Sequence, residues 1–285
     1  MATLLHNLDQ TENKRIEIEI IKNEIIEKYA NGSCVKNING FDDLIKYLRY
    51  KFTLKESDLH YFYRVRKFNT DNQSEIKPYL KRDELIYPPK QNINRMNLEG
   101  DKILYTSINP MTAMAEARLK EGDYFQITKF KLKRDIPYYE LGIFSEMYFN
   151  ITSINSRDEL FKGFVGEIEF DDTLVKYNSA LENLICDFLY DKKENHDDYE
   201  SYIVPAHISK NIFESLSVEA IKYPTTLNRY GTNFVFNEKG TKKLDIIHSS
   251  VMIIEKKYSG GFYKVKSLYE SSSCEDQNNI TFEKI

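Results

Sequence analysis

Residues Tyr87 to Arg118 read YPPKQNINRMNLEGDKILYTSINPMTAMAEAR, and they predict a loop, a strand and a helix in direct succession. The loop is polar and rich in asparagine, carries Arg95 and closes at Gly100. The apolar run from Ile103 to Ile108 predicts a short strand that carries Tyr105. One short segment therefore places an arginine and a tyrosine on adjacent elements, and the helix that follows adds an acid.

The residues at the N-terminus of the segment predict a helix. Asn109 is a favourable N-cap residue, and Pro110 fits the first helical position, where its missing N–H costs nothing. The helix is expected over Met111 to Leu119 and carries Glu116 among alanines, which would let a ligand approach the backbone closely. On spacing alone, an ordinary solvated glutamate is the favoured interpretation.

Short strands and interspersed helices, without regular βαβ alternation, favour an α+β fold. Two helical stripes, from Ile18 to Tyr29 and from Phe41 to Phe52, predict a helical N-terminal extension over residues 1–55. Apolar runs on either side of Ser259-Gly260-Gly261 predict a hairpin, so residues 246–285 are expected to form a C-terminal hairpin and a polar tail. Residues 56–245 lie between these two regions and form the main expected domain.

Composition limits the classes of partner. The 285 residues are 41% hydrophobic and 29% charged, with a net charge of −4, so no basic field points to nucleic acid or an anionic membrane. Three scattered cysteines predict neither a disulfide framework nor a zinc site. The start lacks a secretory signal and no apolar run reaches bilayer length, so a cytoplasmic protein is expected. An amphipathic N-terminal helix leaves a homo-oligomer open.

Several short motifs occur in one order between Tyr61 and Phe236. They are Tyr63-Arg64, Pro88-Pro89, Arg95-Met96-Asn97 with Gly100, Leu104-Tyr105, Thr112-Ala113 with Glu116, Tyr202 to Pro205, Tyr223-Pro224-Thr225 and Gly231-Thr232-Asn233. In order and spacing the chain resembles the RES-domain family, whose second block begins with a strand end at Tyr202 to Pro205. Two positions depart from the family pattern: Thr225 replaces a serine, and His207 stands where a glutamine is usual.

The resemblance implies a fold and an activity. It implies an ADP-ribosyltransferase-like split β-sheet core, and an enzyme that cleaves the bond between nicotinamide and ribose of NAD by phosphorolysis or hydrolysis. NAD would be the substrate and phosphate a co-substrate in the first case, with no resident cofactor or metal. It also implies a toxin paired with a DNA-binding antitoxin protein. An ADP-ribosyltransferase acting on a macromolecule and a non-catalytic RES-like domain that binds a nucleotide or a partner are the alternatives.

The resemblance also implies roles for particular residues. Arg64 and Arg95 are expected to hold the diphosphate, because a guanidinium offers bidentate geometry that lysine lacks. Tyr105 is expected to line the nicotinamide or ribose pocket. Glu116 is expected to act on the ribose hydroxyls and on the cationic transition state. Thr225 is expected to bond the ribose or the acceptor.

Two further assignments are less direct. Asn233 is placed among the substrate-binding residues, although its position before an apolar strand is more typical of a turn or backbone-bonding role. Arg66 lies two residues after Arg64 on the same predicted strand and so faces the same side, which leaves an exchange of roles between these arginines open. His207 is the best-placed histidine, but a lone histidine is usually structural.

Overall fold

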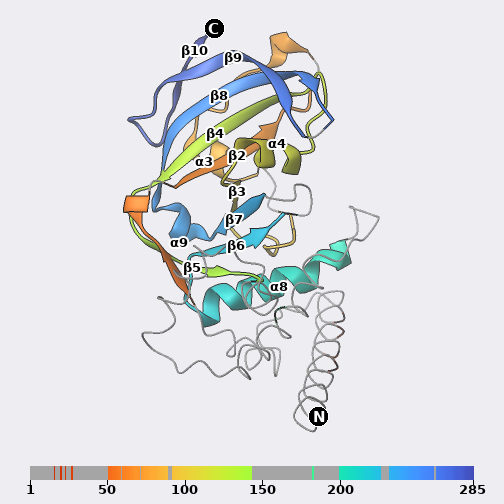
Figure 1. Ribbon diagram of the computed structural model, residues 1–285, viewed down its shortest axis with the longest axis vertical. Helices are drawn as coiled ribbons and strands as arrows, with labels where there is room; N and C mark the ends of the chain where they lie inside the picture. The colour runs from red at the N-terminus through yellow and green to blue at the C-terminus, as the bar shows by residue number, and fades with distance from the viewer. Residues whose placement is uncertain are drawn as a thin grey trace. The chain divides into compact units, whose positions relative to one another are not determined.

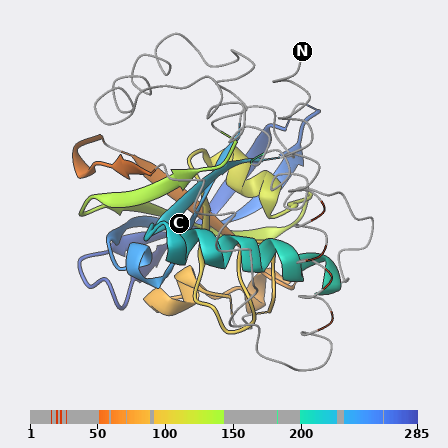
Figure 2. The ribbon, with the colours of Figure 1, turned by 90° about the horizontal axis from the view of Figure 1, so that it is seen from below.

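The computed structural model describes residues 51–58, 60–70, 72–88, 92–142, 199–225, 231–259 and 261–285, with single helical positions at 16, 20, 23, 27 and 182 (Figure 1). The chain divides into two compact units. The first comprises residues 51–92, 99–139 and 218–285 and carries the sheet. The second comprises residues 1–50, 93–98 and 140–217 and carries α8 (Tyr199–Ser215), the long teal helix of Figures 1 and 2.

A ten-stranded sheet organises the described chain, in the order β1-β5-β6-β7-β3-β2-β4-β8-β9-β10. The strands are β1 Phe52–Leu54, β2 Tyr61–Lys67, β3 Leu104–Ser107, β4 Tyr124–Leu132, β5 Ile136–Glu140, β6 Ala220–Pro224, β7 Thr232–Phe236, β8 Leu244–Lys257, β9 Tyr263–Ser273 and β10 Thr281–Lys284. Short helices α3 (Arg82–Ile86), α4 (Pro110–Glu116) and α9 (Glu238–Thr241) and the 3₁₀ turns η1 (Glu56–Asp58) and η2 (Gln73–Glu75) connect them. The described chain is therefore α+β, with a large sheet and few helices.

The predicted strand and capped helix are confirmed by β3 and α4. The Asn109 side chain accepts a hydrogen bond from the Met111 N–H at 2.8 Å, and Pro110 occupies the first turn. The helix ends at Glu116, earlier than expected, because Arg118 adopts a left-handed backbone with φ of 52°. Glu116 therefore lies in the last turn of α4.

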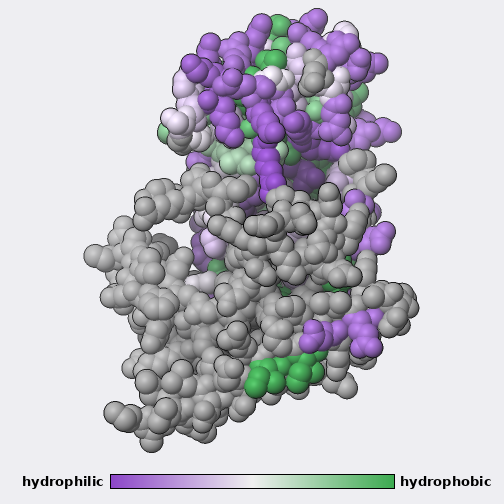
Figure 3. All heavy atoms as spheres, turned by 90° about the vertical axis from the view of Figure 1, so that its right-hand side faces the viewer, coloured by the Kyte–Doolittle hydropathy of each residue, from purple (hydrophilic) through white to green (hydrophobic). Residues whose placement is uncertain are grey.

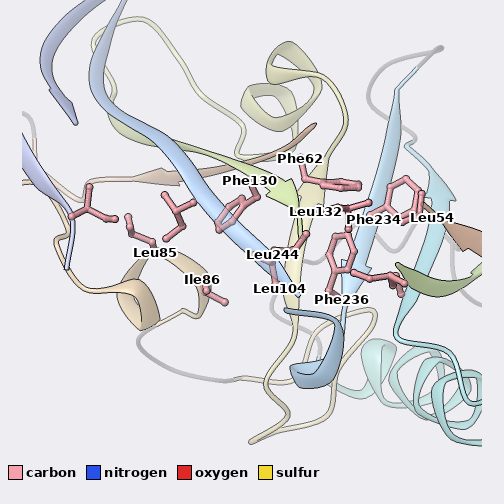
Figure 4. Packing of buried hydrophobic residues seen from close by; sticks show 14 residues of the cluster. Leu54, Phe62, Leu85, Ile86, Leu104, Phe130, Leu132, Phe234, Phe236 and Leu244 are labelled. Carbon is pink, nitrogen blue, oxygen red and sulfur yellow. The ribbon is translucent and has the colours of Figure 1, made fainter. Parts of the chain in front are cut away.

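Apolar side chains cover both faces of the sheet. On the α3 face, Phe62 meets Phe236 edge-on at a ring-centroid distance of 5.0 Å, within the cluster shown in Figure 4. On the opposite face, Met114 of α4 packs with Phe125 and Ile254. Because neighbouring residues of a strand point to opposite faces, each position on β2, β3 and β7 can be assigned to the α3 face or the α4 face.

The predicted hairpin is confirmed by β8 and β9, which pair antiparallel from Lys257↔Tyr263 onward. The polar tail contains more structure than expected, because β10 pairs with β9 and Ile280 is buried in the core beside α3. Gln277 helps to fix this segment by accepting the Ile246 N–H at 2.7 Å. The outer surface near β8, β9 and β10 is mostly hydrophilic, as the purple upper part of Figure 3 shows.

Other elements differ from the sequence prediction. Phe52, expected at the end of a helical stripe, lies in β1. Tyr202 to Pro205, expected as a strand end, lie inside α8, which includes Pro205. Most of the predicted helical N-terminal extension over residues 1–55 falls outside the described residues, apart from the helical positions 16, 20, 23 and 27 and the residues from 51 on. None of the described helices is long and apolar enough to span a bilayer.

Candidate functional site

Three residues predicted for the site meet at one carboxylate oxygen. Oε1 of Glu116 accepts a hydrogen bond from Thr225 Oγ1 and another from Asn233 Nδ2, the latter at 2.7 Å. Glu116 is exposed at the end of α4, Thr225 directly follows β6, and Asn233 is buried on β7. The fold thus brings together side chains that are 109 and 117 residues apart in the chain.

A serine that the sequence analysis missed extends this network. Ser107 Oγ donates to Asn233 Oδ1 at 2.6 Å, and the two residues are direct partners across the β3–β7 ladder. Both are buried. Ser107 lies two residues after Tyr105 and so on the same strand face, which was the one available signal in the sequence.

Tyr105 shares the face of this network. It pairs with Val235 while Ser107 pairs with Asn233, so the alternation of β3 and β7 directs Tyr105 to the same face as the amide of Asn233. Tyr105 is half-buried. Its position is consistent with the predicted role beside the reacting sugar, and that role stays a prediction.

Gly231 allows the close packing behind Thr225. A Cβ atom at residue 231 would lie 2.8 Å from Thr112 Cγ2 and still closer to Thr225 Cγ2. The Gly231 carbonyl also accepts the Thr225 N–H at 3.1 Å, which ties together the two ends of the β6–β7 connection. Glycine here places the Thr225 hydroxyl within reach of Glu116.

Gly231→Ala is expected to displace Thr225 and to lower the free energy of unfolding by about 1–3 kcal/mol. It is also expected to weaken the hydrogen bond from Thr225 to Glu116. The double variant Gly231→Ala/Thr225→Ser should recover part of both losses, because serine lacks the clashing methyl group and keeps the hydroxyl. Urea unfolding and turnover of the two variants measure the effect. Wild-type stability and turnover in Gly231→Ala would contradict the packing argument.

Arg64 occupies the place where β2 and β3 stop pairing. The described β2–β3 ladder contains one residue pair, Tyr63↔Ser107, and Arg64 Nη1 donates to the Tyr105 carbonyl at 3.4 Å. Since Tyr63 shares the face of Ser107, Arg64 projects from the opposite face, where Phe62 packs. The structure therefore links Arg64 to the backbone of Tyr105, and its joint action with Glu116 on one ligand stays a prediction.

The Arg64 guanidinium is a partly buried cation, and its Nε is a hydrogen-bond donor without a partner. The Nε atom itself is buried, and Arg64 forms no ion pair with the residues that the structure describes. Burial, together with the positive charge of Arg66, lowers the pKa of Arg64 to about 10, so the group is still charged at neutral pH. Such a group is suited to an anionic ligand, which would supply both the missing charge and a hydrogen-bond acceptor.

Arg66 is occupied by structural contacts. Its Nη1 donates to the carbonyls of Glu84 and Tyr87 at the end of α3, the latter at 3.5 Å, and its guanidinium lies 4.1 Å from the centre of the Tyr79 ring. The exchange of roles that the sequence left open is therefore disfavoured, and Arg64 is the better candidate for the ligand.

Arg95 lies in the second unit, in a turn closed by two backbone hydrogen bonds between Asn94 and Asn97, at 3.0 and 3.2 Å. It is half-buried. Its predicted contact with the ligand of Arg64 stays a prediction.

Among the described residues, no group of three or more His, Cys, Asp or Glu side chains could hold a metal ion.

His207 is buried on α8 and uncharged at neutral pH. Burial, and to a smaller extent the positive charge of Lys210, lowers its pKa to about 4. The unfolded chain binds this proton near pH 6.5 and the folded chain only near pH 4, so falling pH favours unfolding between these values.

Replacing His207 is expected to remove one source of acid instability. Protonation of His207 should make the free energy of unfolding of the wild-type protein about 2 kcal/mol lower at pH 5 than at pH 7. His207→Gln should not show this decrease. Urea unfolding at the two pH values measures it. His60→Gln, at an exposed position, is the matched control and should keep the wild-type pH dependence. An equal loss in His207→Gln and wild type would show that His207 is not the source.

Comparison with known proteins identifies the family of the chain. The model of the RES domain matches residues 62–252, which is more than half of the chain and includes Arg64, Glu116, Thr225 and Asn233. The chain belongs to the RES-domain family. In this RES protein the Thr225 hydroxyl donates a hydrogen bond to Glu116.

Two further comparisons were informative in different ways. A search of curated proteins found no match. Among solved structures, the chain is similar to the M. tuberculosis MbcT–MbcA toxin–antitoxin complex, with 12% identity and a TM-score of 0.38 over 75% of this chain and 93% of that chain.

Proposed function

We propose that this RES protein cleaves the bond between nicotinamide and ribose of NAD. The observation that carries the proposal is the carboxylate of Glu116, held at Oε1 by Thr225 and Asn233 on an exposed helix end. Family membership supports the same reaction, because the RES resemblance implies NAD degradation.

The geometry of Glu116 suits stabilisation of a sugar cation. Breaking the nicotinamide–ribose bond develops positive charge on the ribosyl carbon, which a fixed carboxylate lowers in energy. Oε1 is occupied by two donors, whereas Oε2 makes no hydrogen bond to the described residues and can face the sugar. Nicotinamide leaves a cationic precursor as a neutral molecule, so a second acid is not required.

Arg64 is the proposed anchor for the diphosphate. Its partly buried guanidinium has an unused donor, and a diphosphate would supply the acceptor that the described protein atoms do not. We propose that Tyr105 lines the nicotinamide or ribose pocket. The single-pair β2–β3 ladder supports an ADP-ribosyltransferase-like split of the sheet at this site.

Incubation of the purified protein with NAD tests the proposal. Chromatography should show free nicotinamide together with ADP-ribose if water is the acceptor, or ADP-ribose 1″-phosphate if phosphate is. Running the reaction with and without phosphate distinguishes the two acceptors. Intact NAD after incubation at high protein concentration, with folding verified by circular dichroism, would contradict the proposal.

The alternatives give different results in the same samples. A transferase would move label from radiolabelled NAD onto protein or nucleic acid of a lysate. A non-catalytic binder would show heat of NAD binding in calorimetry without nicotinamide release. A protein antitoxin, implied by the family resemblance, stays a prediction that co-expression with the neighbouring reading frame and co-purification would test.

A further inference from the structure

Ser107 is buried and makes no direct hydrogen bond to Glu116. It contacts Glu116 only through the amide of Asn233, which accepts from Ser107 Oγ at 2.6 Å and donates to Glu116 Oε1 at 2.7 Å. Neither Ser107 nor Asn233 has more than a few per cent of its surface exposed, 2% in both cases, so water cannot readily replace either partner.

The chemistry of these groups fixes the direction of each hydrogen bond. An ionised carboxylate can only accept, so the NH₂ end of Asn233 must face Glu116 and its carbonyl oxygen must face Ser107. The Ser107 hydroxyl must then act as the donor. The order is Ser107 O–H to Asn233 Oδ1, and Asn233 N–H to Glu116 Oε1.

We infer that Ser107 is a positioning residue, which holds the Asn233 amide in the one orientation that binds and orients the catalytic carboxylate. Without the Ser107 hydroxyl, the buried Oδ1 of Asn233 loses its donor, and a flipped amide would turn an oxygen toward Glu116. The carboxylate would then keep Thr225 as its remaining described partner at Oε1 and lose a defined position. This inference rests on the proposed function for its kinetic consequence.

The neighbouring residue on β3 provides a matched control. Thr106 is also buried and its hydroxyl also bonds to β7, donating to the Phe234 carbonyl at 3.1 Å. It points to the opposite face of the sheet. Thr106→Val and Ser107→Ala therefore each delete one buried hydroxyl between the same two strands, and only the second deletion reaches Glu116.

Ser107→Ala is expected to lower kcat for NAD cleavage about 10- to 100-fold, because small misplacement of a catalytic group has effects of this size, and to leave KM within about twofold. Ser107→Thr, which keeps the hydroxyl, should restore most of kcat. Thr106→Val should keep kcat within about twofold of wild type. Wild-type kcat in Ser107→Ala, or an equal loss in Thr106→Val, would overturn the inference.

An NMR measurement tests the same inference without turnover. In ¹⁵N-labelled protein, the side-chain NH₂ signals of Asn233 are assigned by their loss in Asn233→Asp. They should shift in Ser107→Ala and in Glu116→Gln and stay in place in Thr106→Val. Unmoved signals in Ser107→Ala would overturn the positioning role, whereas absence of NAD cleavage in wild type would overturn the proposed function alone.

Discussion

Glu116→Gln should lose about 10³-fold in kcat for NAD cleavage while keeping its fold. Glutamine has the shape of glutamate, and its oxygen can still accept the hydrogen bonds that Thr225 and Asn233 donate to Oε1. What disappears is the negative charge that faces the developing sugar cation. The free energy of unfolding is therefore expected to change by no more than about 1 kcal/mol. Steady-state kinetics and urea unfolding on the same preparation separate the two effects.

Glu121→Gln is the matched control for this charge change. Glu121 is exposed, lies five residues further along the chain, and accepts the backbone N–H of Lys257 at 2.9 Å. Its replacement removes the same charge from the same region without touching the network of Thr225 and Asn233. If both variants lose activity equally, the loss reflects the overall negative electrostatic potential near α4, and the specific role proposed for Glu116 is wrong.

Arg64→Met should raise KM for NAD by about 10- to 100-fold without reducing stability, because a charged hydrogen bond to a diphosphate contributes about 1.5–3 kcal/mol. Burial lowers the pKa of Arg64 to about 10, so the folded protein bears a desolvation penalty for this cation at neutral pH. Methionine removes that penalty and fills a similar volume. The free energy of unfolding is expected to stay constant or to rise.

Arg66→Met, two residues along the same strand, should give the opposite result. Its guanidinium satisfies carbonyls at the end of α3 and packs on the Tyr79 ring, so stability should fall by about 1–3 kcal/mol while KM for NAD stays near the wild-type value. Loss of stability in Arg64→Met together with an unchanged KM would show that Arg64, like Arg66, is only a structural group.

Local chemistry accounts for the elements that were predicted correctly. The start of α4 follows from the N-cap of Asn109 and from Pro110, and β3 follows from the apolar run that ends at Ile108. The hairpin follows from Ser259-Gly260-Gly261. In each case the signal lies within the element itself or in the turn beside it.

Tertiary contacts explain what was missed. β10 is a short polar strand, which forms because β9 supplies a pairing edge and Ile280 enters the core. The helix α8 was missed as well, because Tyr202 to Pro205 were expected as a strand end and Pro205 lies inside the helix. Propensity and periodicity do not report such long-range pairing.

The contacts among Glu116, Thr225 and Asn233 could not be predicted from the sequence. Family motifs pointed to Glu116, Thr225 and Asn233, but the bond from Asn233 to Glu116 joins residues 117 positions apart, which no local pattern reveals. The expectation that Asn233 makes a turn or backbone bond is wrong: its side chain joins Ser107 to Glu116. Ser107 could be assigned to the site only from the strand register, which pairs it with Asn233.

A crystal structure of the Glu116→Gln variant with bound NAD tests the central claim most directly. We predict that the nicotinamide ribose lies against residue 116, on the sheet face of Ser107 and Asn233, and that the diphosphate reaches the guanidinium of Arg64 where β2 and β3 do not pair and Arg64 contacts the Tyr105 carbonyl. A dinucleotide bound elsewhere, or one whose ribose contacts neither residue 116 nor Thr225, would contradict this assignment.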